Sequence, residues 1–139
     1  MKTRILLLLV GLLSISVSAQ KKKKAKHTDF SITQTKAVKK SGTQLVLKEV
    51  ISDARCPENT TCVWAGEAQA NVSVYKNGKW NDEVIVAFSP QKEHENKEWL
   101  SKMLAIPAEK IKSITLVPYP KEGGKINPKS YKIEVKFNP

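Results

Sequence analysis

The chain has 139 residues, of which 27% are charged and 40% hydrophobic, and its formal net charge is +11. This length suits one domain that is large enough to bury a core. The two cysteines and two histidines match no zinc finger or zinc ribbon spacing. We therefore expect no metal centre and no cofactor.

The first 19 residues predict a secretory signal peptide. Two basic residues precede a short apolar run, and small residues then mark a cleavage site near Ala19 and Gln20. The run is shorter than the roughly 20 residues that span a bilayer, and no cysteine follows it that could carry a lipid. We expect an extracytoplasmic protein, periplasmic or secreted, with no transmembrane segment in the mature chain.

Residues 20–27 predict a basic flexible tail. Its five lysines, together with Lys2 and Arg4 of the signal, account for seven of the eleven net charges and leave +4 for the remainder. Like charges at a terminus repel one another and usually prevent folding. Such a tail suits a solvated tether, or alternatively a contact with an anionic envelope surface. Nucleic acid is disfavoured as a partner because no motif that reads it follows.

Residues 28–139 predict a single β-rich domain, because apolar and polar side chains alternate with a period of two. We expect a mainly β fold, either an antiparallel β-sandwich or a partly open barrel, with one short helix. Asn96 is the expected cap of that helix, which the apolar spacing places over 97–104. The expected strands cover 29–35, 43–51, 111–117 and 131–137, with a hairpin over 68–88.

The turn of the hairpin contains Asn77 and Gly78. A two-residue turn would place the even-numbered apolar residues of the two strands on different faces. A three-residue turn, Lys76–Gly78, pairs Val74 with Trp80 and keeps them on one face, with Gly78 in the left-handed conformation as a bulge. We therefore predict the three-residue turn, since a slip of one residue moves every side chain to the other face.

Cys56 and Cys62 predict a structural disulfide in an exported protein. A redox pair would be C-x-x-C ahead of a helix, whereas this spacing is wider and the following residues have the pattern of a strand. Trp64 is expected in the core beside the disulfide, as in many β-sandwiches. The tip between the cysteines, with Glu58, Asn59 and Thr60, is the candidate recognition loop, because a rigid loop loses less entropy on binding.

No pattern in the chain predicts a catalytic residue. His94 lies between two glutamates, but neighbouring polar groups in such a loop are ordinarily just solvated. The carboxylates between Asp53 and Glu67 have no spacing that indicates glycoside hydrolysis. The predicted function is a non-catalytic envelope module that binds a protein, a glycan or an anionic surface. The alternatives are a small extracytoplasmic hydrolase that uses these carboxylates, or a purely structural envelope component. The oligomeric state stays open.

Three segments carry a resemblance to a known group of proteins: Asp53–Pro57, Cys62–Gly66 and Pro118–Pro120. Their sequences, DARCP, CVWAG and PYP, resemble those of uncharacterised secreted proteins and lipoproteins of bacteria with an RCPxxxxCxWxG core and a C-terminal PYP segment. The resemblance spans roughly residues 43–137. It implies an extracytoplasmic location and supports the disulfide, and it implies no catalytic residue.

Overall fold

The computed structural model describes residues 28–139, so the predicted signal peptide and basic tail lie outside the described residues. Within residues 28–139, two three-stranded antiparallel sheets and one α-helix form the fold, without a closed barrel. The predicted mainly β, antiparallel fold class is thus confirmed. The elements are β1 (Phe30–Thr33), β2 (Thr43–Asp53), β3 (Ala68–Lys76), β4 (Lys79–Phe88), α1 (Glu93–Leu104), β5 (Ile111–Val117) and β6 (Lys132–Phe137), with short 3-10 turns η1 (Pro90–Lys92), η2 (Ala108–Lys110) and η3 (Pro128–Ser130).

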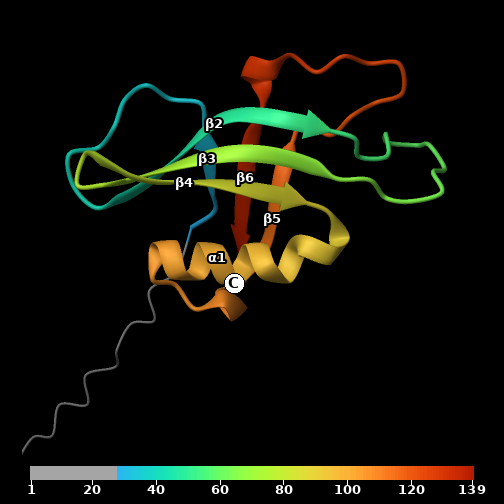
Figure 1. Cartoon of the computed structure of the whole chain (residues 1–139). Helices are drawn as coiled ribbons and strands as arrows, with labels where there is room; N and C mark the ends of the chain where they lie inside the picture. Colours follow the sequence, from blue (N-terminus) through green and yellow to red (C-terminus); the bar gives the residue numbers. More distant parts are fainter. Residues whose placement is uncertain (1–27) are drawn as a thin grey trace, which may run out of the picture.

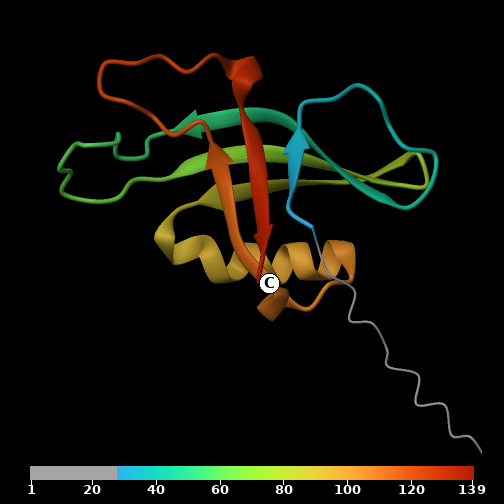
Figure 2. The same ribbon diagram turned by 180° about the vertical axis from the view of Figure 1, so that it is seen from behind.

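The two sheets have the strand orders β2-β3-β4 and β1-β6-β5. Their strands run across one another, with the first sheet in front in Figure 1. Figure 2 shows the second sheet from the other side. Helix α1 lies below β4 and contacts β5, so it closes one side of the space between the sheets.

The core lies between the facing sides of the two sheets. The even positions of β3 from Ala68 to Val74 are completely buried, as are Leu116 and Leu100 of α1. Because Ala68 and Ala70 are small, the two sheets can approach each other closely. On the last strand the predicted alternation holds, because its odd-numbered positions are buried and Lys136 is exposed.

The predicted three-residue turn of the hairpin is wrong. The turn has two residues, Asn77 and Gly78, with φ of 50° and 79°. Positive φ at both positions is the geometry that fits the twist of a tight hairpin, and Asn-Gly is the pair best suited to it. Gly78 is thus left-handed as expected, but it belongs to a shorter turn.

A bulge in the hairpin keeps the even-numbered apolar residues of β3 and β4 on one face, although the two-residue turn alone would place them on different faces. Tyr75 pairs with Trp80, and the register then shifts so that Val74 pairs with Asp82. Asn81 is therefore the extra residue. Beyond it even positions face even positions, which keeps the valines of both strands inward, while Trp80 pairs with Tyr75 on the outer face instead of with Val74.

Helix α1 begins four residues earlier than predicted, at Glu93 instead of Lys97. Asn96 is not its cap but a buried residue inside it, and its Nδ2 donates to the Ala87 carbonyl at 2.8 Å. Acidic side chains in the first turn interact favourably with the helix dipole, and Glu93 pairs with Lys97 at 2.7 Å. Among residues 28–139, no helix has the length and apolarity needed to cross a membrane.

Candidate functional site

The candidate site is built around the connection from β2 to β3, in which residues 54–66 form a loop that we call the clasp. The predicted disulfide between Cys56 and Cys62 is confirmed, with 6.0 Å between the two Cα atoms. Backbone N–H groups of Ala54 and Cys56 donate to the carbonyls of Glu67 and Ala65, each at 2.9 Å. The two arms of the clasp are therefore joined both covalently and by hydrogen bonds.

Gly66 allows the arms of the clasp to lie this close. Its φ is +71°, and a Cβ atom built on it would overlap the carbonyl oxygen of Ala54. Any side chain at this position would therefore push the two arms apart, in addition to the strain of a left-handed backbone.

A buried ion pair fixes the clasp to the end of β2. The Nε and Nη2 atoms of Arg55 donate to the two carboxylate oxygens of Asp53 at 2.8 and 2.6 Å, and the side chains are 5% and 9% exposed. This two-point geometry is the most directional form of an arginine–carboxylate interaction.

Arg55 also ties the clasp to the end of β5. Nη1 donates to the Leu116 carbonyl at 2.6 Å, and Nη2 donates to the Pro118 carbonyl at 3.1 Å. The guanidinium lies over the ring of Tyr119, 4.6 Å from its centroid, which is a cation–π contact. The backbone N–H of Glu58 adds a bond to Pro120 at 2.9 Å. The PYP segment is thus the surface on which the clasp rests.

Tyr131 completes this buried network by donating its hydroxyl to Asp53 Oδ2 at 3.0 Å. Burial raises the pKa of Asp53, but hydrogen bonds and charge from Arg55, together with the Tyr131 bond, outweigh it and leave the pKa below its usual value. Burial and the neighbouring carboxylate raise the pKa of Tyr131 to about 12. At neutral pH the network therefore holds an ionised Asp53 and a neutral Tyr131.

The predicted burial of Trp64 beside the disulfide is wrong. Its side chain is 69% exposed, and Val63 before it is fully exposed. Strand β3 begins only at Ala68, so Trp64 lies in the clasp and does not enter the sheet. The space under the clasp is occupied by Arg55 and its partners instead of by an indole ring. The predicted recognition residues Glu58, Asn59 and Thr60 are exposed at the tip, and their part in recognition stays a prediction.

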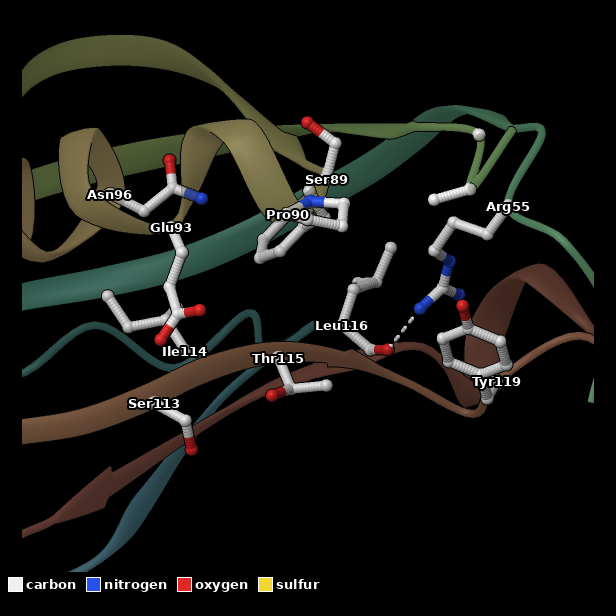
Figure 3. A pocket seen from close by; sticks show the side chains of 13 residues that line it. Arg55, Ser89, Pro90, Glu93, Asn96, Ser113, Ile114, Thr115, Leu116 and Tyr119 are labelled. Carbon is white, nitrogen blue, oxygen red and sulfur yellow. Dashed lines mark hydrogen bonds between the residues drawn. The ribbon is translucent and has the colours of Figure 1, made fainter. Parts of the chain in front are cut away.

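A cleft of about 250 Å³ opens beside the clasp, between β5 and the start of α1. Figure 3 shows Arg55 and Tyr119 on one side of it and Glu93 on the other. Apolar groups make up most of the lining surface, and the polar groups come from the clasp, α1, β5, Ser89 and Tyr119. Its residues are Ala65, Gly66, Phe88, Pro90, Ile114 and Leu116, together with Arg55, Ser89, Glu93, Asn96, Ser113, Thr115 and Tyr119.

Two of the carboxylates considered for hydrolysis, Asp53 and Glu67, make other contacts. Both oxygens of Asp53 accept bonds from Arg55, and Glu67 accepts bonds from Gln69 and Ser89. A lowered pKa also makes Asp53 a weak general base. Across residues 28–139, no three histidine, cysteine, aspartate or glutamate residues gather as a metal site would require.

Sequence reasoning missed the cleft and the part of Tyr131 in the network. Tyr131 was predicted only as the first residue of the last strand, and the lining residues of β5 alternate as in any strand. The signal that pointed to this region was the PYP segment, whose central Tyr119 stacks on Arg55.

Comparison with known proteins finds no matching family model, no significantly similar curated protein and no significantly similar solved structure. The resemblance to secreted bacterial proteins and lipoproteins therefore stays a prediction.

Proposed function

We propose that this protein is an extracytoplasmic, non-catalytic module that binds another protein through its clasp. The observation that carries the proposal is the exposure of two adjacent apolar residues, Val63 and Trp64, on a loop whose backbone is fixed at several points. The disulfide is compatible with an oxidising compartment outside the cytoplasm.

The exposed pair is suited to the centre of a protein interface. Tryptophan is among the residues that contribute most to binding energy when a partner covers it. Leaving Val63 and Trp64 in water loses the free energy that their burial would give, roughly 1.5–3 kcal/mol for a valine-sized side chain. Because the disulfide and Arg55 hold the loop, little conformational entropy is lost when a partner docks.

The cleft beside the clasp supports a protein partner over a free small molecule. Its volume of about 250 Å³ lies below the roughly 300–1,000 Å³ of typical small-molecule sites. It is large enough for one apolar side chain, which the walls of Phe88, Ile114 and Leu116 would surround. A partner that covers Trp64 could thus place one apolar side chain in the adjacent cleft.

The test compares two tryptophans of similar exposure. Wild-type protein, Trp64→Ala and Trp80→Ala are immobilised and exposed to envelope extract from the producing cells, and retained proteins are quantified by mass spectrometry. The proposal expects a protein that wild type and Trp80→Ala retain and Trp64→Ala does not. That protein, once purified, should bind Trp64→Ala at least about tenfold more weakly than wild type.

Two results would count against this proposal. One is a set of retained proteins that is the same for all three samples. The other is a purified partner whose affinity for Trp64→Ala equals that for wild type. Thermal melting of each variant shows that the fold is intact, which we expect because both side chains are exposed.

A further inference from the structure

The opposite end of the sheet β2-β3-β4 carries a second, larger hollow on its outer face. The hollow has a volume of about 840 Å³ and lies between the sheet, the connection from β1 to β2, and η3. Gln34 joins two of these walls, since its Nε2 donates to the Pro128 carbonyl at 2.6 Å. We call this hollow the hairpin groove, because the β3–β4 hairpin forms one side of it.

Two aromatic side chains form one wall of the hairpin groove. Tyr75 and Trp80 are direct cross-strand partners in the hairpin and both line the groove. The Trp80 side chain is 61% exposed, although it is one of the largest apolar groups of the chain. Side chains directly opposite on antiparallel strands lie on the same face of the sheet, so both rings lie on the face of the hairpin that lines the groove.

The charge inside the hairpin groove is positive. Its charged lining residues are Lys36, Lys48, Lys129 and Glu83. Glu83 accepts two bonds from Lys48, at 3.0 and 3.1 Å, and one from Asn71 at 2.6 Å. This carboxylate is therefore already neutralised within the wall, and Lys36 and Lys129 remain to attract an anion.

More lysines surround the tip of the hairpin. Lys76 and Lys79 flank the turn as a cross-strand pair, and Gly78 lies against the backbone of Lys39 and Lys40. These side chains are exposed. Positive potential from several such groups adds up over a surface and attracts polyanions from solution.

We infer that the hairpin groove binds an acidic polysaccharide, whose sugar rings stack on Trp80 and Tyr75 and whose carboxylates contact Lys36 and Lys129. This site is separate from the protein-binding site proposed at the clasp and goes beyond it. The aromatic wall is the feature that favours an acidic polysaccharide over a polyanion without sugar rings, because the lysines alone would attract either.

The aromatic wall of the groove suits the sugar rings of such a ligand, and the lysines suit its carboxylates. A pyranose ring presents a face of C–H groups, which packs against the electron-rich face of an aromatic ring. The groove supplies hydroxyl and amide groups for the sugar hydroxyls, among them Gln34, Thr35 and Ser73. A carboxylate on each sugar unit meets the lysines at the rim, where opposite charges attract in a salt-dependent way.

The test measures binding of an eight-unit galacturonate oligomer to the exported chain by calorimetry at physiological salt. Trp80→Ala should bind about tenfold more weakly than wild type, whereas Trp80→Phe should retain most of the affinity. Lys36→Gln combined with Lys129→Gln should weaken binding and reduce its dependence on salt. Residues 20–27 are the same in every variant, so differences between variants report on the groove.

Matched controls separate the groove from general charge attraction. Lys102→Gln combined with Lys112→Gln removes the same charge from exposed positions outside the groove and should bind like wild type, as should Trp64→Ala. Neutral maltooctaose should bind far more weakly than the galacturonate oligomer.

Three outcomes would overturn the inference. The first is equal affinity of wild type and Trp80→Ala for the oligomer. The second is equal binding of an octaglutamate peptide, which has the charges without the sugar rings. The third is binding to phosphatidylglycerol vesicles or single-stranded DNA that depends on Trp80 while the oligomer does not bind.

Discussion

The connections between neighbouring strands at the two ends of the sheet β2-β3-β4 are held in place in different ways. At one end, β2 and β3 are connected by the clasp, which a disulfide, a buried ion pair and Gly66 hold in place. At the other end, β3 and β4 are connected by two residues. The backbone N–H of Asn77 donates to the Gly42 carbonyl, and the Gly42 N–H donates to Oδ1 of Asn77. In Figure 1 these connections lie at opposite sides of the molecule.

This difference shows how connection length determines what holds a segment. A two-residue turn has few backbone groups to satisfy, so local conformational preference is enough. A long connection cannot satisfy its own polar groups, and it loses more entropy on ordering. The clasp therefore depends on side chains from distant segments, and substitutions there should cost more than equivalent ones near the hairpin.

The largest effect should come from breaking the ion pair at the clasp end. Arg55→Met leaves Asp53 buried without its main partner, and we expect it to lower the free energy of unfolding by about 3–5 kcal/mol. The comparison is Lys48→Met, which breaks the exposed pair with Glu83 near the hairpin and should change stability little. Urea unfolding of both variants measures the difference, and similar losses would contradict the contrast between the two ends.

Two glycines with similar backbone angles give the next largest contrast. Gly66 has φ of +71° and Gly78 of +79°, but only at Gly66 would a Cβ atom overlap neighbouring backbone. Gly78→Ala should cost about 1 kcal/mol, the strain of a left-handed alanine. Gly66→Ala should cost about 2–4 kcal/mol, because overpacking adds to that strain. Thermal and urea unfolding would measure both, and equal losses would show that the arms of the clasp can separate freely.

Removing the disulfide should have a smaller effect. The bond closes a loop with a sequence separation of 6 residues, and loss of so short a closure costs about 2 kcal/mol in the chain-entropy model. We expect Cys56→Ala/Cys62→Ala to keep the fold, because Arg55 and the backbone bonds of the clasp remain. Far-ultraviolet circular dichroism with urea unfolding checks both points. A loss well above that of Arg55→Met would show that the disulfide, and not Arg55, is the main support of the clasp.

The sequence predicted well those parts of the fold that depend on local alternation. The strand at Ile111–Val117 has the predicted bounds, and the last strand differs only at its first residue. Each buries one face and exposes the other, so its period of two is visible in the residues. The disulfide was equally predictable, because the chain has only two cysteines.

The errors lie where distant segments decide the outcome. Trp64 was predicted to be buried because it is large and apolar, but Arg55 occupies the space under the clasp with partners 61 and 63 residues away. The hairpin turn was misjudged because Asn81 forms a bulge, which no residue type marks. Neither feature leaves a periodic signal in the sequence.

The smallest effect should come from Tyr131, and it should depend on pH. Tyr131→Phe removes the hydroxyl bond to Asp53 and should cost about 1.5 kcal/mol at neutral pH, as expected for a bond to a charged group. Folding raises the pKa of Tyr131 from 10.0 to about 12. The stabilisation is therefore complete below pH 10 and is lost as the pH rises towards 12, because the unfolded chain loses the tyrosine proton first. Urea unfolding of wild type and Tyr131→Phe from pH 7 to 11.5 should show that the difference between their free energies of unfolding becomes smaller above pH 10. A difference in free energy of unfolding that stays constant with pH would mean that Tyr131 does not bond to the ionised Asp53, and that the clasp is held in place without this bond.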